Sequence, residues 1–242
     1  RKLLVLNQIV IVVFNGIMKK VKYKLSILIL THNRPELFKR CFKAILNCKP
    51  DYPIEIIVNN DSSDIDELYS DDDNITVRYY YKKYKKLGDV YKFLYTKSQG
   101  DFIYYNEDDD YIKPCFFDHI DYKHDLYIMN YISYPLIQIH GIIKAMALID
   151  NSNLTKLEFK DYLKYHDDTQ FQLGQIVFKR QLVEPFFRSN YASCLEFDYN
   201  LFKSLNVTTF KYIKTPTWCQ TTDGKDNLSF KYLNNDKRYP TI

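Results

Sequence analysis

Four consecutive acidic residues, Glu107 to Asp110, directly follow Asn106 and the apolar and aromatic run Phe102 to Tyr105. Carboxylates placed this closely repel one another unless a cation or a network of donors holds them. A short apolar run bounded by polar residues predicts a buried strand, and open α/β sheets bind ligands where their parallel strands end. The stretch therefore predicts either a cation site at a sheet edge or a solvated acidic loop.

Two other strand ends should carry polar residues to the same edge. Leu25–Leu30 and Ile54–Val58 are near-continuous apolar runs, which is typical of strands buried on both faces. The segment between them, Glu36–Leu46, has apolar residues at helical spacing, so the three elements predict a βαβ unit and a parallel sheet. Further strands are expected at 75–81, 126–131, 142–149 and 208–213, a strand running into a helix at 174–180, and helices at 64–69, 89–97, 156–165 and 196–205.

Composition places the chain among soluble globular proteins. Of its 242 residues 46% are hydrophobic and 26% are charged, and the net charge of +4 is too small to require a nucleic-acid partner. The five cysteines have no metal-type spacing, which favours reduced thiols and a cytoplasmic location, with peripheral membrane association as the second possibility. Residues 1–17 are interpreted as a non-core leader or extension and residues 18–242 as a single domain, with halves at 18–112 and 113–242.

Three motifs, Ser26–Leu37, Ile57–Asp64 and Gly100–Asp110, resemble the family 2 glycosyltransferases in order and spacing. In the second half, Gly174–Arg180 and Phe197–Lys203 resemble that family more weakly. The resemblance implies the GT-A fold, a Rossmann-like α/β/α sandwich with a mostly parallel central sheet. It also implies a metal-dependent enzyme that moves a sugar from a nucleotide-diphospho-sugar to an acceptor hydroxyl, with inversion at the anomeric carbon.

The same resemblance implies a role for each matching residue. The donor-binding residues would be Thr31, His32, Asn33, Asn60 and Asp108; the ligands of a Mn²⁺ or Mg²⁺ ion would be Asp109 and Glu107; the catalytic base would be Asp198, with Glu196 as the rival. Asp110 is expected behind the metal ligands rather than among them.

Departures from the family pattern keep other functions open. Asn59 and Asn60 replace the usual acids, so a UDP-sugar is favoured but another base could fit, and Phe197 replaces the usual acid before Asp198. The alternatives are a nucleotidyltransferase-like enzyme of similar fold and a non-catalytic nucleotide-binding module. The acceptor could be a glycan, a lipid-linked sugar, a protein or modified DNA, and no obligate protein partner is evident.

Several other features have a functional and a structural interpretation. Trp218 could stack on an acceptor sugar or pack in the core. The Tyr- and Lys-rich segment 79–97 could follow a phosphate backbone or a membrane surface, or it could simply expose its lysines. A further polar cluster at 166–168 and the lone histidines His119, His124 and His140 are more typical of surface or structural positions.

Overall fold

The computed structural model describes residues 2–6, 9–14, 17–20, 22–62, 65–84, 87–134, 173–188, 201 and 204–221. The strand predicted at 142–149 and the helices predicted at 156–165 and 196–205 lie outside or almost wholly outside these ranges.

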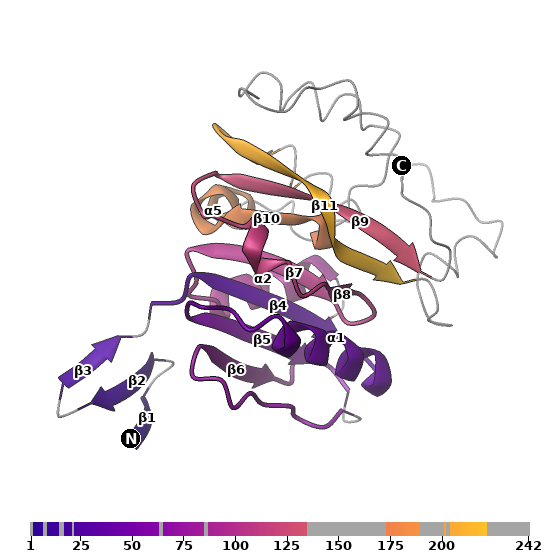
Figure 1. The fold of residues 1–242 in the computed structure, drawn as a ribbon. Helices are drawn as coiled ribbons and strands as arrows, with labels where there is room; N and C mark the ends of the chain where they lie inside the picture. Colours follow the sequence, from indigo (N-terminus) through magenta and orange to yellow (C-terminus); the bar gives the residue numbers. More distant parts are fainter. Residues whose placement is uncertain are drawn as a thin grey trace.

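An eight-stranded sheet in the order β6-β5-β4-β7-β10-β9-β11-β8 forms the centre of the molecule (Figure 1). Its first half consists of β4 (Leu25–Thr31), β5 (Ile54–Asn60), β6 (Ile75–Tyr80) and β7 (Phe102–Glu107), which all run parallel. The side chains of β5 are buried along its whole length, as expected for a parallel strand covered on both faces. The α/β class with a mostly parallel sheet, predicted from these apolar runs, is confirmed.

The order of the first four strands puts helices on both faces of the sheet. Helix α1 (Pro35–Asn47) connects β4 to β5, and α2 (Leu87–Lys97) leads from β6 back across the sheet to β7. Because such connections are right-handed, two connections that run in opposite directions cover opposite faces (Figure 1). The crossover direction changes between β4 and β7, and this is the point where open α/β sheets bind their ligands.

The second half of the sheet is mixed. Strand β10 (Ile176–Lys179) pairs antiparallel with β7 and with β9 (Leu126–Tyr134), and β9 pairs parallel with β11 (Phe210–Thr221). The short β8 (Tyr111–Ile112) pairs antiparallel with β11. Single 3₁₀ turns lie at Phe117–His119 and Leu173–Gln175, and α5 (Arg180–Arg188) follows β10, as the predicted strand-to-helix transition requires.

Two of the expected elements differ from the structure. The predicted helix at 64–69 is wrong for the described residues from 65 on, because the Tyr79 hydroxyl donates to the carbonyl of Leu68 and accepts from its N–H, which ties this irregular segment to β6. The last strand runs to Thr221 instead of ending at Ile213. Pro216 interrupts the register of β11 with β9 but does not end the strand. Proline lacks an N–H donor, and it lies at an irregularity in the pairing, where that donor is not needed.

A separate antiparallel sheet is formed by β1 (Lys2–Leu6), β2 (Ile9–Phe14) and β3 (Ile17–Lys20), which pair only with one another among the described strands (Figure 1). The third of these strands extends past the boundary predicted after residue 17. None of the described helices is long and apolar enough to cross a membrane.

A buried polar network joins the amino-terminal ends of the parallel strands. Glu55 on β5 is fully buried and forms an ion pair with Arg78 on β6, and it accepts a hydrogen bond from Ser26 on β4. The N–H of Gly100, just before β7, donates to Ser26 Oγ at 2.8 Å and to Glu55 Oε1 at 3.1 Å. The network therefore holds all four parallel strands in register at the edge opposite the acidic turn.

A second carboxylate, that of Asp125 just before β9, joins the strands of the other half. Its Oδ1 accepts from Lys179 Nζ at 2.7 Å, and its Oδ2 accepts from the backbone of Thr208 at 3.0 Å and of Thr209 at 3.2 Å. Burial alone would raise its pKa, but these donors outweigh burial and lower the pKa to about 2.

Replacing Gly100 with Ala should destabilise the fold. A Cβ at this position would lie 2.6 Å from both N and Oγ of Ser26, so the turn before β7 would have to move away from Glu55. We expect a loss of about 1–3 kcal/mol in the free energy of unfolding, measured by urea denaturation. The exposed Lys43→Ala on α1 is the control, and an unchanged midpoint for Gly100→Ala would contradict the close packing.

Asp125 should make stability depend on pH in the acid range. Because its folded-state pKa lies below the ordinary value of 3.8, its stabilisation is complete above about pH 4 and is lost as pH falls toward about 2. In urea denaturation, the free energy of unfolding of wild type should exceed that of Asp125→Asn by the largest amount at neutral pH. This difference should shrink as the pH falls from about 4 to about 2. A constant difference would contradict this role. The exposed Lys43→Ala removes no carboxyl group and is the control.

Candidate functional site

The ends of β4, β5 and β7 meet at the change of crossover direction. Thr31 pairs in register with Asn60 on one side of β4, and Leu30 pairs with Glu107 on the other. The loops that follow these three strands therefore share one edge of the sheet. The sequence predicted this convergence, and the observed registers confirm it.

The acidic turn between β7 and β8 is largely buried. Asp108, Asp109 and Asp110 are 4%, 3% and 2% exposed, and Glu107 is exposed. The turn closes through a hydrogen bond of 3.2 Å from the N–H of Asp110 to the carbonyl of Glu107. The interpretation as a solvated acidic loop is thus wrong for three of the four residues.

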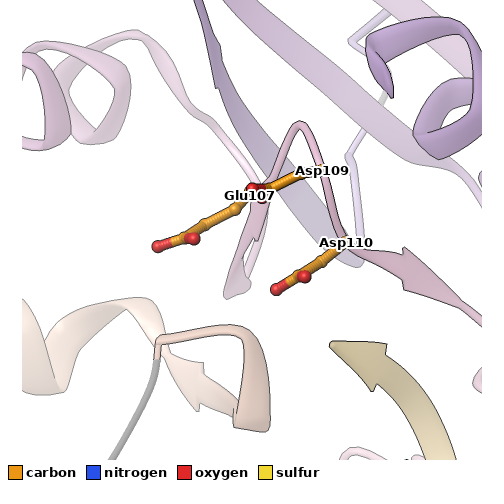
Figure 2. A group of neighbouring side chains, drawn as sticks. All are labelled: Glu107, Asp109 and Asp110. Atoms are coloured by element: carbon orange, nitrogen blue, oxygen red, sulfur yellow. The ribbon is translucent and has the colours of Figure 1, made fainter. Parts of the chain in front are cut away.

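Three of these carboxylates can reach a common point. Glu107, Asp109 and Asp110 each place an oxygen within 4.8 Å of the others (Figure 2). Burial raises the pKa of Asp110 well above its usual range, and the charges of Glu107 and Asp109 raise it further. An all-oxygen set whose members repel one another suits a hard dication such as Mg²⁺ or Mn²⁺. The predicted ligands Glu107 and Asp109 are brought together, and Asp110 lies with them rather than behind them.

Arg34 neutralises part of this charge from the neighbouring loop. Its Nη1 donates to Asp108 Oδ1 at 2.9 Å and to Asp109 Oδ2 at 3.2 Å. Burial raises the pKa of Asp108 to about 6, against the opposing effect of the Arg34 guanidinium. Arg34 immediately precedes Pro35 at the start of α1, and its side chain does not cap the helix, so the guanidinium is available to bridge the two aspartates.

Arg40 and Thr221 brace the other side of the turn. Nη2 of Arg40, one and a half turns further along α1, donates to the carbonyl of Asp109 at 2.6 Å and to Thr221 Oγ1 at 2.8 Å. The N–H of Thr221, the last residue of β11, donates to Asp110 Oδ1 at 2.9 Å. The far end of the chain's last described strand thus completes the acidic site.

Asn106, which lies just before the acidic turn, holds the turn in place through side-chain hydrogen bonds. Its Oδ1 accepts from the Tyr104 hydroxyl at 2.8 Å, and its Nδ2 donates to Cys41 Sγ at 2.9 Å and to the carbonyl of Asp110 at 3.4 Å. The side chain is buried, so this network fixes the backbone from which the aspartates project.

The predicted donor-binding residues other than Asp108 form a second group at the ends of β4 and β5. Thr31 and Asn60 are buried, whereas His32 and Asn33 are exposed, and Asn33 has a left-handed φ of 50°, which Asn tolerates better than most residues. Nδ1 of His32 contacts Asp61, and the N–H of Asn33 donates to Ser62 Oγ at 3.0 Å. These contacts join the loops after β4 and β5.

The two candidate bases, Asp198 and Glu196, lie outside the described residues, as do His140 and the cluster at 166–168. The described His119 and His124 do not belong to the acidic group. Trp218 is 0% exposed, and its ring leaves no room for a Cβ on Gly174, so of its two interpretations the structure supports packing in the core and excludes stacking on a sugar. It packs in the core beside Tyr131.

Part of the Tyr- and Lys-rich segment packs on itself. Nζ of Lys82 lies 4.8 Å from the centroid of the Phe93 ring, and Nζ of Lys97 lies 5.7 Å from that of Tyr80. The amide of Asn59 exchanges hydrogen bonds with the backbone of Lys82, which fixes the start of the loop after β6. These contacts give both lysines a structural role.

Sequence reasoning missed four residues that brace the acidic turn: Arg34, Arg40, Asn106 and Thr221. Arg34 and Asn106 lie within the motifs that define the site. Arg34 could have been found from the sequence, because it is a cation in a loop that should face the acidic cluster. No local pattern marks Arg40 or Thr221, because both reach the turn only through the fold.

Comparison with known proteins agrees with this arrangement. The family model described as glycosyl transferase family 2 matches residues 26–156, just over half of the chain. The chain belongs to this family. The matched segment contains β5, β7, all of β4 except its first residue, and all four residues of the acidic turn. The resemblance found in the three motifs is therefore confirmed.

Solved structures of TarS from S. aureus share the fold of this family 2 chain. TarS residues 1–349 in complex with UDP-GlcNAc match with a TM-score of 0.61 and 13% identity over 85% of this chain and 60% of that one. The structure described only as TarS 1–349 gives a TM-score of 0.60 and 14% identity over 82% and 60%. At this identity the likeness shows the GT-A fold, and the chain spans about three fifths of those proteins. No curated protein matches the sequence.

Replacing Arg34 should make the protein depend more strongly on a dication. In Arg34→Gln the buried Asp108 and Asp109 lose a neutralising charge, so the protein without metal should melt lower and saturating Mn²⁺ should restore more stability. We expect the Mn²⁺-induced rise in Tm to be about 2–4 °C larger than in wild type. The exposed Lys39→Gln on the same helix is the control, and an equal rise in Arg34→Gln and wild type would contradict this role.

Proposed function

We propose that this family 2 chain is a metal-dependent glycosyltransferase that moves a sugar from a nucleotide-diphospho-sugar to an acceptor hydroxyl, with inversion. The observation that carries the proposal is the group of Glu107, Asp109 and Asp110 at the change of crossover direction. Family membership supports the reaction class, and the TarS structures that contain UDP-GlcNAc or UDP support a nucleotide-sugar donor.

The acidic group would hold Mn²⁺ or Mg²⁺ through Glu107, Asp109 and Asp110. When bound, such an ion neutralises the negative charge that develops on the leaving diphosphate. The protein's task is to hold these carboxylates in place and to offset part of their charge. Arg34 donates to the carboxylate of Asp109, the N–H of Thr221 donates to that of Asp110, and Arg40 donates to the backbone carbonyl of Asp109.

The nucleotide would lie along the edge from β7 to β5. Asp108 forms an ion pair with Arg34 from the loop after β4, and we assign to it the contact with the ribose that the family resemblance implies. Thr31, His32, Asn33 and Asn60 would surround the base. In this proposed arrangement the diphosphate would lie over the carboxylate group, as charge neutralisation at the leaving group requires.

The acceptor hydroxyl needs a carboxylate within hydrogen-bond reach on the face opposite the leaving group. By resemblance to the family we assign this role to Asp198, with Glu196 as the rival. Mutation can separate the two candidates. If Asp198 is the base, Asp198→Asn should abolish sugar transfer while donor binding persists; if Glu196 is the base, Glu196→Gln should do so instead.

Replacing Asp109 should abolish turnover without unfolding the protein. With Mn²⁺ and a panel of nucleotide sugars, wild type should release nucleoside diphosphate slowly by hydrolysis in the absence of acceptor. Asp109→Asn should lower this rate by about 100-fold or more, because charge on the leaving group is no longer matched. The near-ultraviolet circular dichroism spectrum should stay native, and the exposed Asp118→Asn should keep the wild-type rate.

Two outcomes would overturn parts of this proposal. Full metal-dependent turnover by Asp109→Asn would exclude the metal assignment. Binding of a nucleotide sugar by wild type without any turnover would indicate a non-catalytic nucleotide-binding module instead of an enzyme.

A further inference from the structure

Four lysines gather where β6 ends and along the helix that follows it. Lys82 and Lys83 come after the end of β6, Lys92 lies on α2, and Lys97 is the last residue of α2. The first three are exposed and Lys97 is half-buried. Within the described part of the chain, none of the four forms an ion pair. We call these four residues the α2 lysine patch.

Two of these ammonium groups are held against the same ring. Nζ of Lys82 lies 4.8 Å and Nζ of Lys97 lies 5.6 Å from the centroid of the Phe93 ring. The backbone of Lys82 is fixed by the amide of Asn59. The carbonyl of Lys97 accepts from Arg78 Nη2 at 2.9 Å. Like charges brought together repel, and the ring offsets only part of this repulsion, so an external anion would be bound favourably.

The carboxylates nearest to the patch in the sequence and the fold are placed elsewhere. Glu55 is fully buried and pairs with Arg78, and Glu67 accepts from two tyrosine hydroxyls. Asp89 is the only acidic residue of α2 and lies in its first turn, where the helix dipole favours an acid. The patch therefore presents positive charge to an external partner.

The aromatic rings beside the patch are not free to stack on a ligand. Phe93 is buried beneath the two ammonium groups, and Tyr80 packs edge-on against it with the ring centroids 5.2 Å apart. Tyr84 also packs against Phe93, at 5.6 Å. A single-stranded nucleic acid needs open aromatic faces on which its bases stack, and the patch does not offer them. A partner recognised by charge alone fits better, and an anionic lipid surface is such a partner.

We propose that the α2 lysine patch docks the protein on an anionic lipid surface. The patch begins at Lys82, which Asn59 ties to the carboxyl end of β5. Docking would therefore bring the sheet edge that carries the candidate site close to the lipid. The inference goes beyond the proposed function and does not depend on it, because docking needs neither a donor nor an acceptor.

Sedimentation with vesicles tests this inference. Wild type should bind vesicles of equal parts phosphatidylcholine and phosphatidylglycerol but not vesicles of phosphatidylcholine alone, and added salt should release it. Each lysine near an anionic surface strengthens binding about fivefold, so the double variant Lys83→Glu with Lys92→Glu should bind at least about 25-fold more weakly. Both side chains are exposed, so the fold should be kept, as near-ultraviolet circular dichroism can verify.

The matched control is the double variant Lys39→Glu with Lys43→Glu. It makes the same change of charge at two exposed positions of α1, which covers the opposite face of the sheet, and it should lose far less binding. An equal loss in both double variants would show that net charge rather than the patch attracts the lipid, and would overturn the inference.

The wild-type protein alone can also overturn the inference. Absence of binding to the anionic vesicles would exclude docking on lipid. Binding of inorganic polyphosphate without binding of vesicles would assign the patch to a soluble polyanion instead. Either result would leave the glycosyltransferase proposal intact, because turnover of nucleotide sugars is measured separately and without vesicles.

Discussion

Mutual repulsion among the carboxylates of the β7–β8 turn is the constraint on which the rest of the site depends. Three adjacent aspartates are buried there, and burying charges without compensation is far too costly for a fold of ordinary stability. Compensation comes from three separate parts of the chain. Arg34 comes from the loop after β4, Arg40 from α1, and the N–H of Thr221 from the end of β11. Both halves of the protein therefore contact the turn. The same contacts that neutralise its charge also hold the turn in its folded position.

The strand order explains why these groups meet there. Because β4 lies between β5 and β7, its end is flanked by the ends of both neighbours. The loops that follow these three strands therefore lie close together. At the opposite edge, Glu55 and Gly100 hold the same strands in register through a buried network. Binding chemistry and structural support therefore occupy opposite ends of one set of strands. The polar residues at each end of the strands can therefore serve one role only, either ligand binding or structural support.

Much of the fold could be predicted from local pattern. The apolar runs that became β4, β5 and β7, the helical spacing of α1, and the transition from β10 to α5 are all signals that short segments carry themselves. Failures arose where distant residues decided the outcome. The segment after residue 64 is not helical because a hydroxyl on β6 bonds its backbone, and β11 continues past Pro216 because β9 supports it. The sequence left two roles open for Trp218, because its burial depends on the distant Gly174 and Tyr131.

The sequence by itself determined the family, the parallel sheet and the convergence of three polar loops, because strand direction and residue type are local properties. Only the tertiary structure decided how the polar groups are shared. It placed Asp110 with Glu107 and Asp109, assigned Asp108 to Arg34, and turned the oxygen of Asn60 toward Ser62. Such pairings depend on distances of a few ångströms between segments far apart in the chain, and no spacing along the sequence encodes them.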